Sequence, residues 1–258
     1  MNNAKRRLVA ALSALATVPS ASRAQQSQAW RTVHQPASWH SITVDHAVSP
    51  RMALWFDGQW RRMGVGGRPQ QLLLRPGLQL ALAPGVRVAS GYAYIATAPY
   101  GEAPSPTPLR EHRTWQQLVL SHGAGALSVS HRYRWEQRWI SAKLTDDEAR
   151  ESRGPWLYQQ RARYLSRIQG NLPRLRVGSR PWLALISDEI LLPIGHSEAH
   201  ARFAQNRASI GVGVPVSARA RLELSYLNLW NALPSARTNE INHTVNFGWV
   251  WRSAPPSG

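Results

Sequence analysis

Residues 127–139, with the sequence LSVSHRYRWEQRW, alternate between two kinds of side chain. Leucine, valine, histidine, tyrosine and tryptophan occupy nearly all of the odd positions, and serine, arginine and glutamate occupy the even ones. Successive side chains of a β-strand point to opposite faces, so this segment predicts a strand with one aromatic, apolar face and one charged face.

The same period-two pattern recurs along most of the chain, and no stretch after residue 25 sustains a helical apolar period. Short turns near residues 48–50, 83–85, 122–126, 170–173 and 215–218 alternate with longer polar loops, as in an outer-membrane barrel. The sequence therefore predicts a closed antiparallel transmembrane β-barrel of 12 strands, with 10 as the alternative and both chain ends on the short-turn side. The further runs are 39–47, 52–61, 70–82, 86–94, 110–121, 158–164, 176–189, 205–214, 219–226 and 242–251, with 30–33 as a short twelfth.

The composition agrees with a barrel and argues against several other classes. The 258 residues include 31 Lys plus Arg against 14 Asp plus Glu, a formal charge of +17, yet Lys5 and Lys143 are the only lysines. The absence of cysteine excludes a disulfide scaffold and any thiolate site. Twelve tryptophans and seven tyrosines against three phenylalanines favour interfacial aromatic girdles over a dry core.

The N-terminal residues are typical of an export signal. Lys5, Arg6 and Arg7 precede a short apolar stretch, and small residues ending at Ala24 resemble a cleavage site. We therefore predict a signal peptide at 1–24, an N-terminal lead-in with a short strand at 25–38, the barrel at 39–252 and a C-terminal tail at 253–258. Export carries the chain away from cytoplasmic nucleic acid, so we expect no nucleic-acid partner.

The two faces of the strands have different expected surroundings. A soluble β-sandwich is the alternative, but it would mix lysine with glutamate on its solvated faces. In a lipid-embedded barrel the apolar face meets hydrocarbon, and the arginine and glutamate side chains pair across strands inside the lumen. The predicted lumen-lining network comprises Glu111, Arg113, Arg132, Arg134, Glu136, Arg138, Arg161, Arg163, Glu189, Gln205, Arg207, Arg221 and Glu223.

Six short motifs in order also resemble a known family: EHRTWQQL at 111–118, RYRWEQR at 132–138, DE at 188–189, QNR at 205–207, LELSYLN at 222–228 and NH at 242–243. They are similar to the signature of an uncharacterised bacterial outer-membrane barrel family, domain of unknown function 2490. The resemblance implies an exported barrel of Gram-negative bacteria and implies no substrate or reaction. Separately, Phe247, Trp249 and Trp251 resemble the C-terminal signal that the barrel-insertion machinery reads.

These features leave several functions open. Excess arginine in a lumen favours a small channel with anion preference and a small anionic solute. The alternative is a non-conducting envelope barrel whose side chains plug the lumen. A less favoured alternative is an outer-membrane hydrolase using His112, His131 or His243, although no Gly-x-Ser-x-Gly motif is present. We expect no cofactor and no metal, membrane lipid as a partner, and lipopolysaccharide phosphates bound by Arg61, Arg62 and Arg68.

Overall fold

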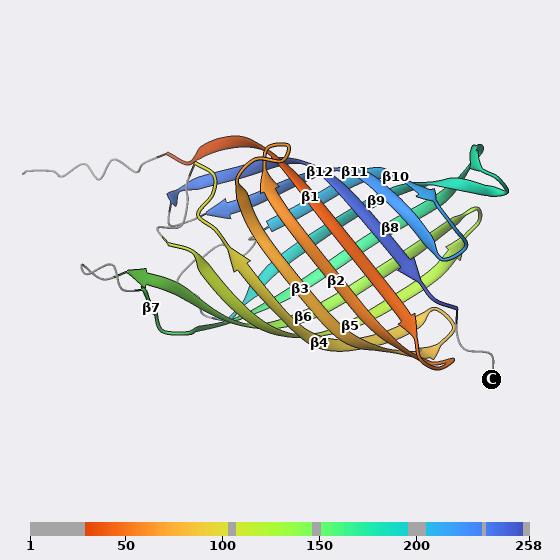
Figure 1. Ribbon diagram of the computed structural model, residues 1–258, viewed down its shortest axis with the longest axis horizontal. Helices are drawn as coiled ribbons and strands as arrows, with labels where there is room; N and C mark the ends of the chain where they lie inside the picture. Colours follow the sequence, from red (N-terminus) through yellow and green to blue (C-terminus); the bar gives the residue numbers. More distant parts are fainter. Residues whose placement is uncertain (1–28, 103–106, 146–150, 196–204, 234–235, 255–258) are drawn as a thin grey trace, which may run out of the picture.

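The computed structural model describes residues 29–102, 107–145, 151–195, 205–233 and 236–254. Its strands run obliquely around a central axis and form one barrel (Figure 1). No helix in the described part of the chain is long and apolar enough to cross a membrane. The strands are β1 (Arg31–Ala47), β2 (Met52–Met63), β3 (Pro69–Ala83), β4 (Val86–Thr97), β5 (Leu109–Ala124), β6 (Leu127–Thr145), β7 (Glu151–Arg153), β8 (Leu157–Val177), β9 (Arg180–Ile194), β10 (Gln205–Pro215), β11 (Ala220–Leu233) and β12 (Thr238–Arg252).

The sheet is a meander in which consecutive strands pair antiparallel, with β6 passing directly to β8. The short β7 pairs with the end of β6, outside the main sheet. β12 pairs with β1 and closes a barrel of eleven strands. The shortest of the eleven, β10, has 11 residues, and about 9 to 11 residues suffice for a membrane-spanning strand. The predicted fold class is confirmed, with eleven barrel strands in place of twelve.

The odd strand number decides how the barrel closes. When strands alternate in direction, the first and last of an odd set run the same way, so β1 and β12 are parallel. Arg31 therefore lies at the end with the longer loops, and Arg252 lies at the end with the short turns. The expectation that both ends of the chain lie on the short-turn side is not met for these residues, and the all-antiparallel closure is corrected to one parallel seam.

Two boundaries also differ from expectation. Residues 31–38, expected as a lead-in with a separate short strand, are continuous with the next predicted run and form the first half of β1. The turn expected at 170–173 lies within β8, which continues to Val177 through a register irregularity between Leu172 and Arg176. Pro173 lacks a backbone N–H, and such a shift lets a strand accommodate it.

The outer wall is apolar over much of the circumference. Leu78, Ile186, Ile210 and Leu224 are each about half exposed, although they lie on four different strands. Contiguous apolar exposure on this scale marks a surface that meets lipid or another apolar partner. Outward-facing aromatic side chains lie near both ends of the strands. Trp60, Trp139 and Tyr158 lie towards the longer loops, and Trp249 and Trp251 lie towards the short turns. This apolar band flanked by aromatic rings is the surface of a transmembrane barrel.

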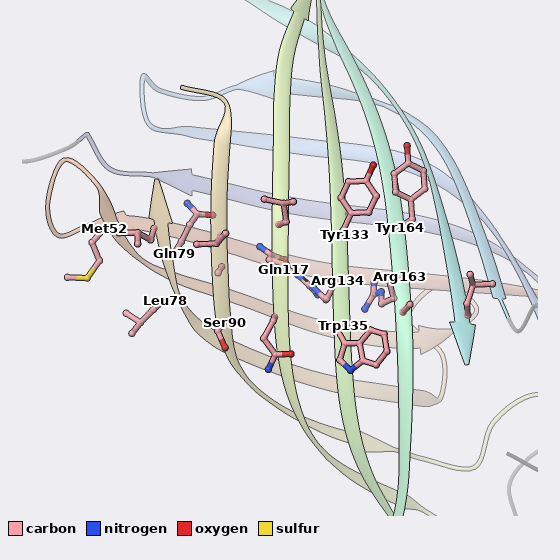
Figure 2. Close-up of a pocket in the computed structure, with 17 residues that line it drawn as sticks. Met52, Leu78, Gln79, Ser90, Gln117, Tyr133, Arg134, Trp135, Arg163 and Tyr164 are labelled. Carbon is pink, nitrogen blue, oxygen red and sulfur yellow. Dashed lines mark hydrogen bonds between the residues drawn. The ribbon is translucent and has the colours of Figure 1, made fainter. Parts of the chain in front are cut away.

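The wall around β6 shows the alternation directly. Tyr133, Arg134 and Trp135 follow one another along the strand, beside Arg163 and Tyr164 of β8 (Figure 2). Tyr133 and Trp135 are 47% and 38% exposed, whereas the intervening Arg134 is 3% exposed. A shallow, mainly apolar groove of about 810 Å³ crosses this part of the wall. The charged face of β6 therefore points into the barrel.

Candidate functional site

The structure places the charged side chains predicted for the lumen inside the barrel, where most of them form ion pairs. Arg134 donates to Gln117 on β5, Gln205 accepts from Arg207, and Glu111 accepts from Arg113 and Arg138. Alternation carries them inward from β5, β6, β8, β9, β10 and β11. They form one large network and one separate cluster.

Glu136 is the centre of the large network. Its side chain has no exposure to solvent, and its two oxygens accept from three guanidinium groups. Arg113 and Arg163 donate to Oε1 at 3.0 and 2.8 Å, and Arg161 donates to Oε2 from Nε and Nη2 at 2.9 and 2.6 Å. Charge-assisted bonds of this kind are stronger than neutral ones. The arrangement joins three adjacent strands through a single carboxylate.

Glu189 extends the network around the barrel. Arg163 forms a forked pair with it at 2.7 and 2.8 Å, while Arg132 and Arg207 approach at 2.7 and 3.3 Å. Because Arg132 belongs to β6 and Glu189 to β9, their bond passes over β8 inside the lumen. The carboxylate thus holds side chains from β6, β8 and β10 together.

Glu223 belongs to a separate cluster near the short turns. It accepts from Arg221 on its own strand and from Arg167 of β8, both at 2.7 Å. The Arg167 contact bridges two strands that have β9 and β10 between them, so it crosses the interior. Arg167 was not among the predicted residues, because the predicted run ended at residue 164, although Arg167 shares the parity of Arg161 and Arg163.

Other interior residues were also absent from the prediction. Asp57 of β2 pairs with Arg75 of β3 at 3.1 Å, and both side chains are less than a tenth exposed. Arg61 is buried beneath the loops and lies 3.7 Å from the centre of the Trp39 ring. The alternation of runs 52–61 and 70–82 carries enough information to find these residues, because they share the inward parity.

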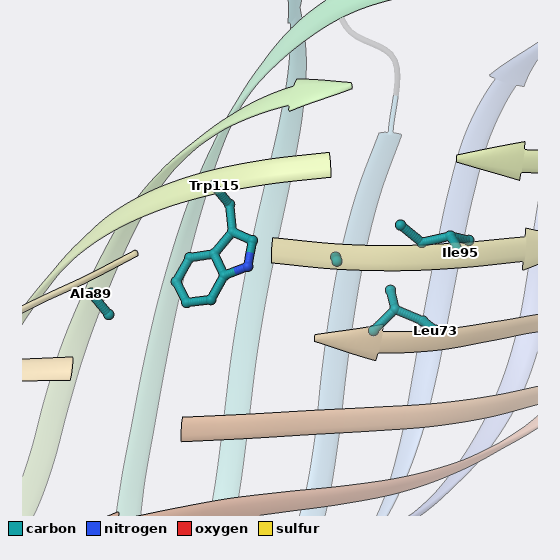
Figure 3. Close-up of a cluster of buried hydrophobic side chains, with 5 residues drawn as sticks. Leu73, Ala89, Ile95 and Trp115 are labelled. Atoms are coloured by element: carbon teal, nitrogen blue, oxygen red, sulfur yellow. The ribbon is translucent and has the colours of Figure 1, made fainter. Parts of the chain in front are cut away.

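An aromatic layer fills the middle of the barrel. Trp115 is fully buried and packs with Leu73, Ala89, Ala93 and Ile95 (Figure 3). The ring of Trp55 meets Trp115 edge-on, with centroids 5.3 Å apart. Arg134 lies 4.9 Å from the Trp115 centroid, a cation–π distance. This layer connects β2 with β5 and β6 across the lumen.

Two paired glycines make room for Trp115. Gly77 and Gly91 face each other across β3 and β4. A Cβ atom at Gly77 would lie 2.5 Å from Cζ2 of Trp115, and one at Gly91 would lie 2.7 Å from the same atom. The indole therefore rests directly on backbone, which only glycine allows at both positions.

Substituting Gly77 tests this packing. We expect Gly77→Ala to lower the free energy of unfolding by about 1–3 kcal/mol, the usual cost of overpacking. Urea titration of the barrel in detergent micelles measures the change. Gly213→Ala is the matched control, since a Cβ there has ordinary contacts of 3.4 Å or more. Equal losses in the two variants would contradict the packing.

Above this layer lies a polar chamber of about 110 Å³. Arg61, Arg207 and Glu111 are among its walls, and so is Tyr100, which follows β4. Burial raises the pKa of Tyr100 to about 12, so the phenol keeps its proton well above neutral pH. The chamber is thus a small, strongly basic space on the long-loop side of the aromatic layer.

The histidines considered for catalysis lie on the outer wall. His112, His131 and His243 hydrogen-bond Tyr92, Tyr164 and Tyr226 respectively, the last two at 2.9 and 2.6 Å. All three therefore lie on the faces of their strands that point away from the lumen. Across the described ranges, no group of three or more His, Cys, Asp or Glu side chains is arranged to hold a metal.

The arginines expected to bind lipopolysaccharide do not all lie on the surface. Arg61 points into the barrel, so it is not available to a lipopolysaccharide phosphate; its neighbour Arg62 lies over the Trp60 ring at 4.5 Å, and Arg68 is exposed. Phe247, Trp249 and Trp251 alternate along the outer face of β12. The insertion role of these three rings stays a prediction.

Comparison with known proteins now adds a family. The model of a family described as a protein of unknown function, DUF2490, matches residues 37–240. The chain belongs to this family. The match covers most of the DUF2490 barrel, from β1 into β12. No curated protein matches this DUF2490 member. Among solved structures, it is similar to the NanC porin in a rhombohedral crystal form, at 9% identity and a TM-score of 0.44, over 75% of this chain and 86% of that one.

Proposed function

We propose that this protein is an outer-membrane barrel with a plugged lumen, which does not conduct ions in its resting state. The observation that carries the proposal is the complete burial of Trp115 and Glu136 inside the barrel, since a water-filled pore would wet them. Side chains fill narrow barrels of about 8 strands in the same way. Here the ion pairs and the aromatic layer extend that filling to eleven strands and make the wall rigid.

A small anion-preferring channel is the second candidate. It is supported by the surplus of arginine over carboxylate inside the barrel, which raises the local concentration of anions. Such a channel requires the aromatic layer to move. The two candidates therefore differ in whether the closed interior opens under voltage.

Electrical recording separates them. We expect refolded protein in a planar bilayer to be silent, and the double variant Trp55→Ala with Trp115→Ala to conduct, because it removes both rings that fill the middle of the lumen. The matched control is Trp60→Ala with Trp249→Ala, which removes the same volume from the exposed outer wall and stays silent. Stable conductance of the unaltered protein, with anion preference in a salt gradient, would establish the channel instead.

A further inference from the structure

The charge balance of the chamber is uneven. Its walls hold seven arginines, namely Arg61, Arg75, Arg113, Arg138, Arg161, Arg163 and Arg207. Glu111 is the only carboxylate among its described lining residues. Three carboxylates outside the lining also form ion pairs with these arginines: Asp57 with Arg75, Glu136 with Arg113, and Glu189 with Arg207. Counting the nearby buried Glu240 as well still leaves two more arginines than carboxylates. Buried charge is costly unless it is paired, so this wall favours an added anion.

The surplus is concentrated at Arg61 and Arg207. Arg61 donates to the amide oxygens of Gln59 and Gln71 and forms no ion pair within the described residues. Arg207 reaches Glu189 only at 3.3 Å, and its Nε has no partner among the described atoms. Both guanidinium groups lie against the same Trp39 ring, at 3.7 and 5.4 Å from its centre. Two neighbouring cations repel each other, and an anion between them would relieve the repulsion.

Unpaired polar atoms in the walls indicate the chemistry of that anion. Among the described residues, Nε of Arg75 and Nε of Arg207 are donors without acceptors, whereas Oε1 of Gln70 and Oδ1 of Asn242 are acceptors without donors. Arg75, Gln70 and Asn242 are each at least nine-tenths buried. A ligand that satisfies all four atoms must both accept and donate hydrogen bonds. Hydrogen phosphate does both, whereas sulfate and chloride at neutral pH only accept.

The chamber is large enough for such a ligand. A chamber of about 110 Å³ holds several waters and has room for one phosphate group. Arginine suits such a ligand because its planar fork matches phosphate oxygens in pairs.

We propose that the chamber binds one hydrogen-phosphate group, which enters from the long-loop side. The group is either free inorganic phosphate or the phosphate end of a monoester whose remainder stays outside. Binding needs no conduction, so this site stands or falls independently of the proposed plugged lumen.

Isothermal titration calorimetry of the refolded barrel in detergent tests the site by measuring its affinity for inorganic phosphate, sulfate and chloride at equal ionic strength. We expect phosphate to bind at least tenfold more tightly than sulfate. Arg61→Gln and Arg207→Gln are each expected to weaken phosphate binding tenfold or more, with Arg61→Lys intermediate. Arg221→Gln, at the far end of the interior, is the matched control and is expected to bind as the unaltered protein does.

A second ligand, a folding check and one more variant complete the experiment. Glycerol phosphate distinguishes a monoester ligand from free inorganic phosphate. A site that is open on one side binds the monoester, whereas a site closed around the ligand binds only inorganic phosphate. A heat-modifiable gel shift verifies that each variant is folded. Gln70→Leu removes a hydrogen-bond acceptor without altering the charge, and we expect it to reduce the ratio of phosphate affinity to sulfate affinity. The proposal is overturned if phosphate binds no better than chloride, or if Arg221→Gln weakens binding as much as Arg61→Gln.

Discussion

Replacing Glu136 with glutamine is expected to lower the free energy of unfolding by about 3–5 kcal/mol, the usual cost of removing one partner from a buried ion pair. Glutamine preserves the shape of the side chain and removes its charge. Arg113, Arg161 and Arg163 would then share an interior with one carboxylate fewer, and Arg161 would lose its only ion-pair partner among the described residues. Urea titration in detergent micelles, followed by the heat-modifiable gel shift, measures the loss.

The matched control for this prediction is Glu223→Gln. Glu223 also contacts two arginines, but its side chain is 12% exposed, and those of Arg167 and Arg221 are 31% and 17% exposed. Water can therefore solvate the guanidinium groups that are left behind, so we expect a loss of about 1 kcal/mol, as for exposed pairs. Equal losses in the two variants would show that Glu136 is not a buried centre of the network.

Cysteine labelling is expected to place the two ends of the barrel sequence on opposite sides of the membrane. The natural sequence contains no cysteine, so single replacements report position without a background signal. Because β1 and β12 are parallel, Trp30→Cys should react like Val65→Cys in the β2–β3 loop, and Ala254→Cys should react like Val216→Cys in a short turn. The measurement is modification of intact cells by a membrane-impermeant maleimide.

The reference positions make this result independent of which side faces outward. Val65 is 87% exposed and Val216 is 49% exposed, so both are accessible to the reagent from their own side. Detergent permeabilisation should make all four cysteines reactive, which verifies that none is buried. If Trp30→Cys and Ala254→Cys reacted together in intact cells, the barrel would have an even number of spanning strands.

Alternation alone was sufficient to predict which side chains point inward. The side chains of Arg132, Arg134 and Glu136 occupy every second position, and this spacing determines their face whatever their neighbours are. The alternation could not predict contacts between strands that are not adjacent, such as Arg167 with Glu223, because these depend on the curvature and closure of the whole sheet. It could not reveal that Trp115 rests on Gly77 and Gly91, which are far from it along the chain.

The strand number was harder to obtain for a similar reason. Residues 30–33 and 39–47 were predicted as two separate strands. In the structure Pro36 lies within β1, in register with His243 of the parallel neighbour β12. Whether such a segment forms one strand or two depends on the available partner, and that partner lies at the other end of the sequence.

The parallel seam also has a consequence for the order of assembly. The antiparallel neighbours in the barrel are joined by a turn or loop, but Arg31 and Thr238 meet across 207 positions of the chain. Contacts so distant in sequence form slowly, since the entropy of closing the loop is lost before they stabilise it. We therefore expect the β1–β12 pairing to form last. Until it does, two strand edges carry unpaired backbone groups, and we expect an assembly factor to matter most at this step.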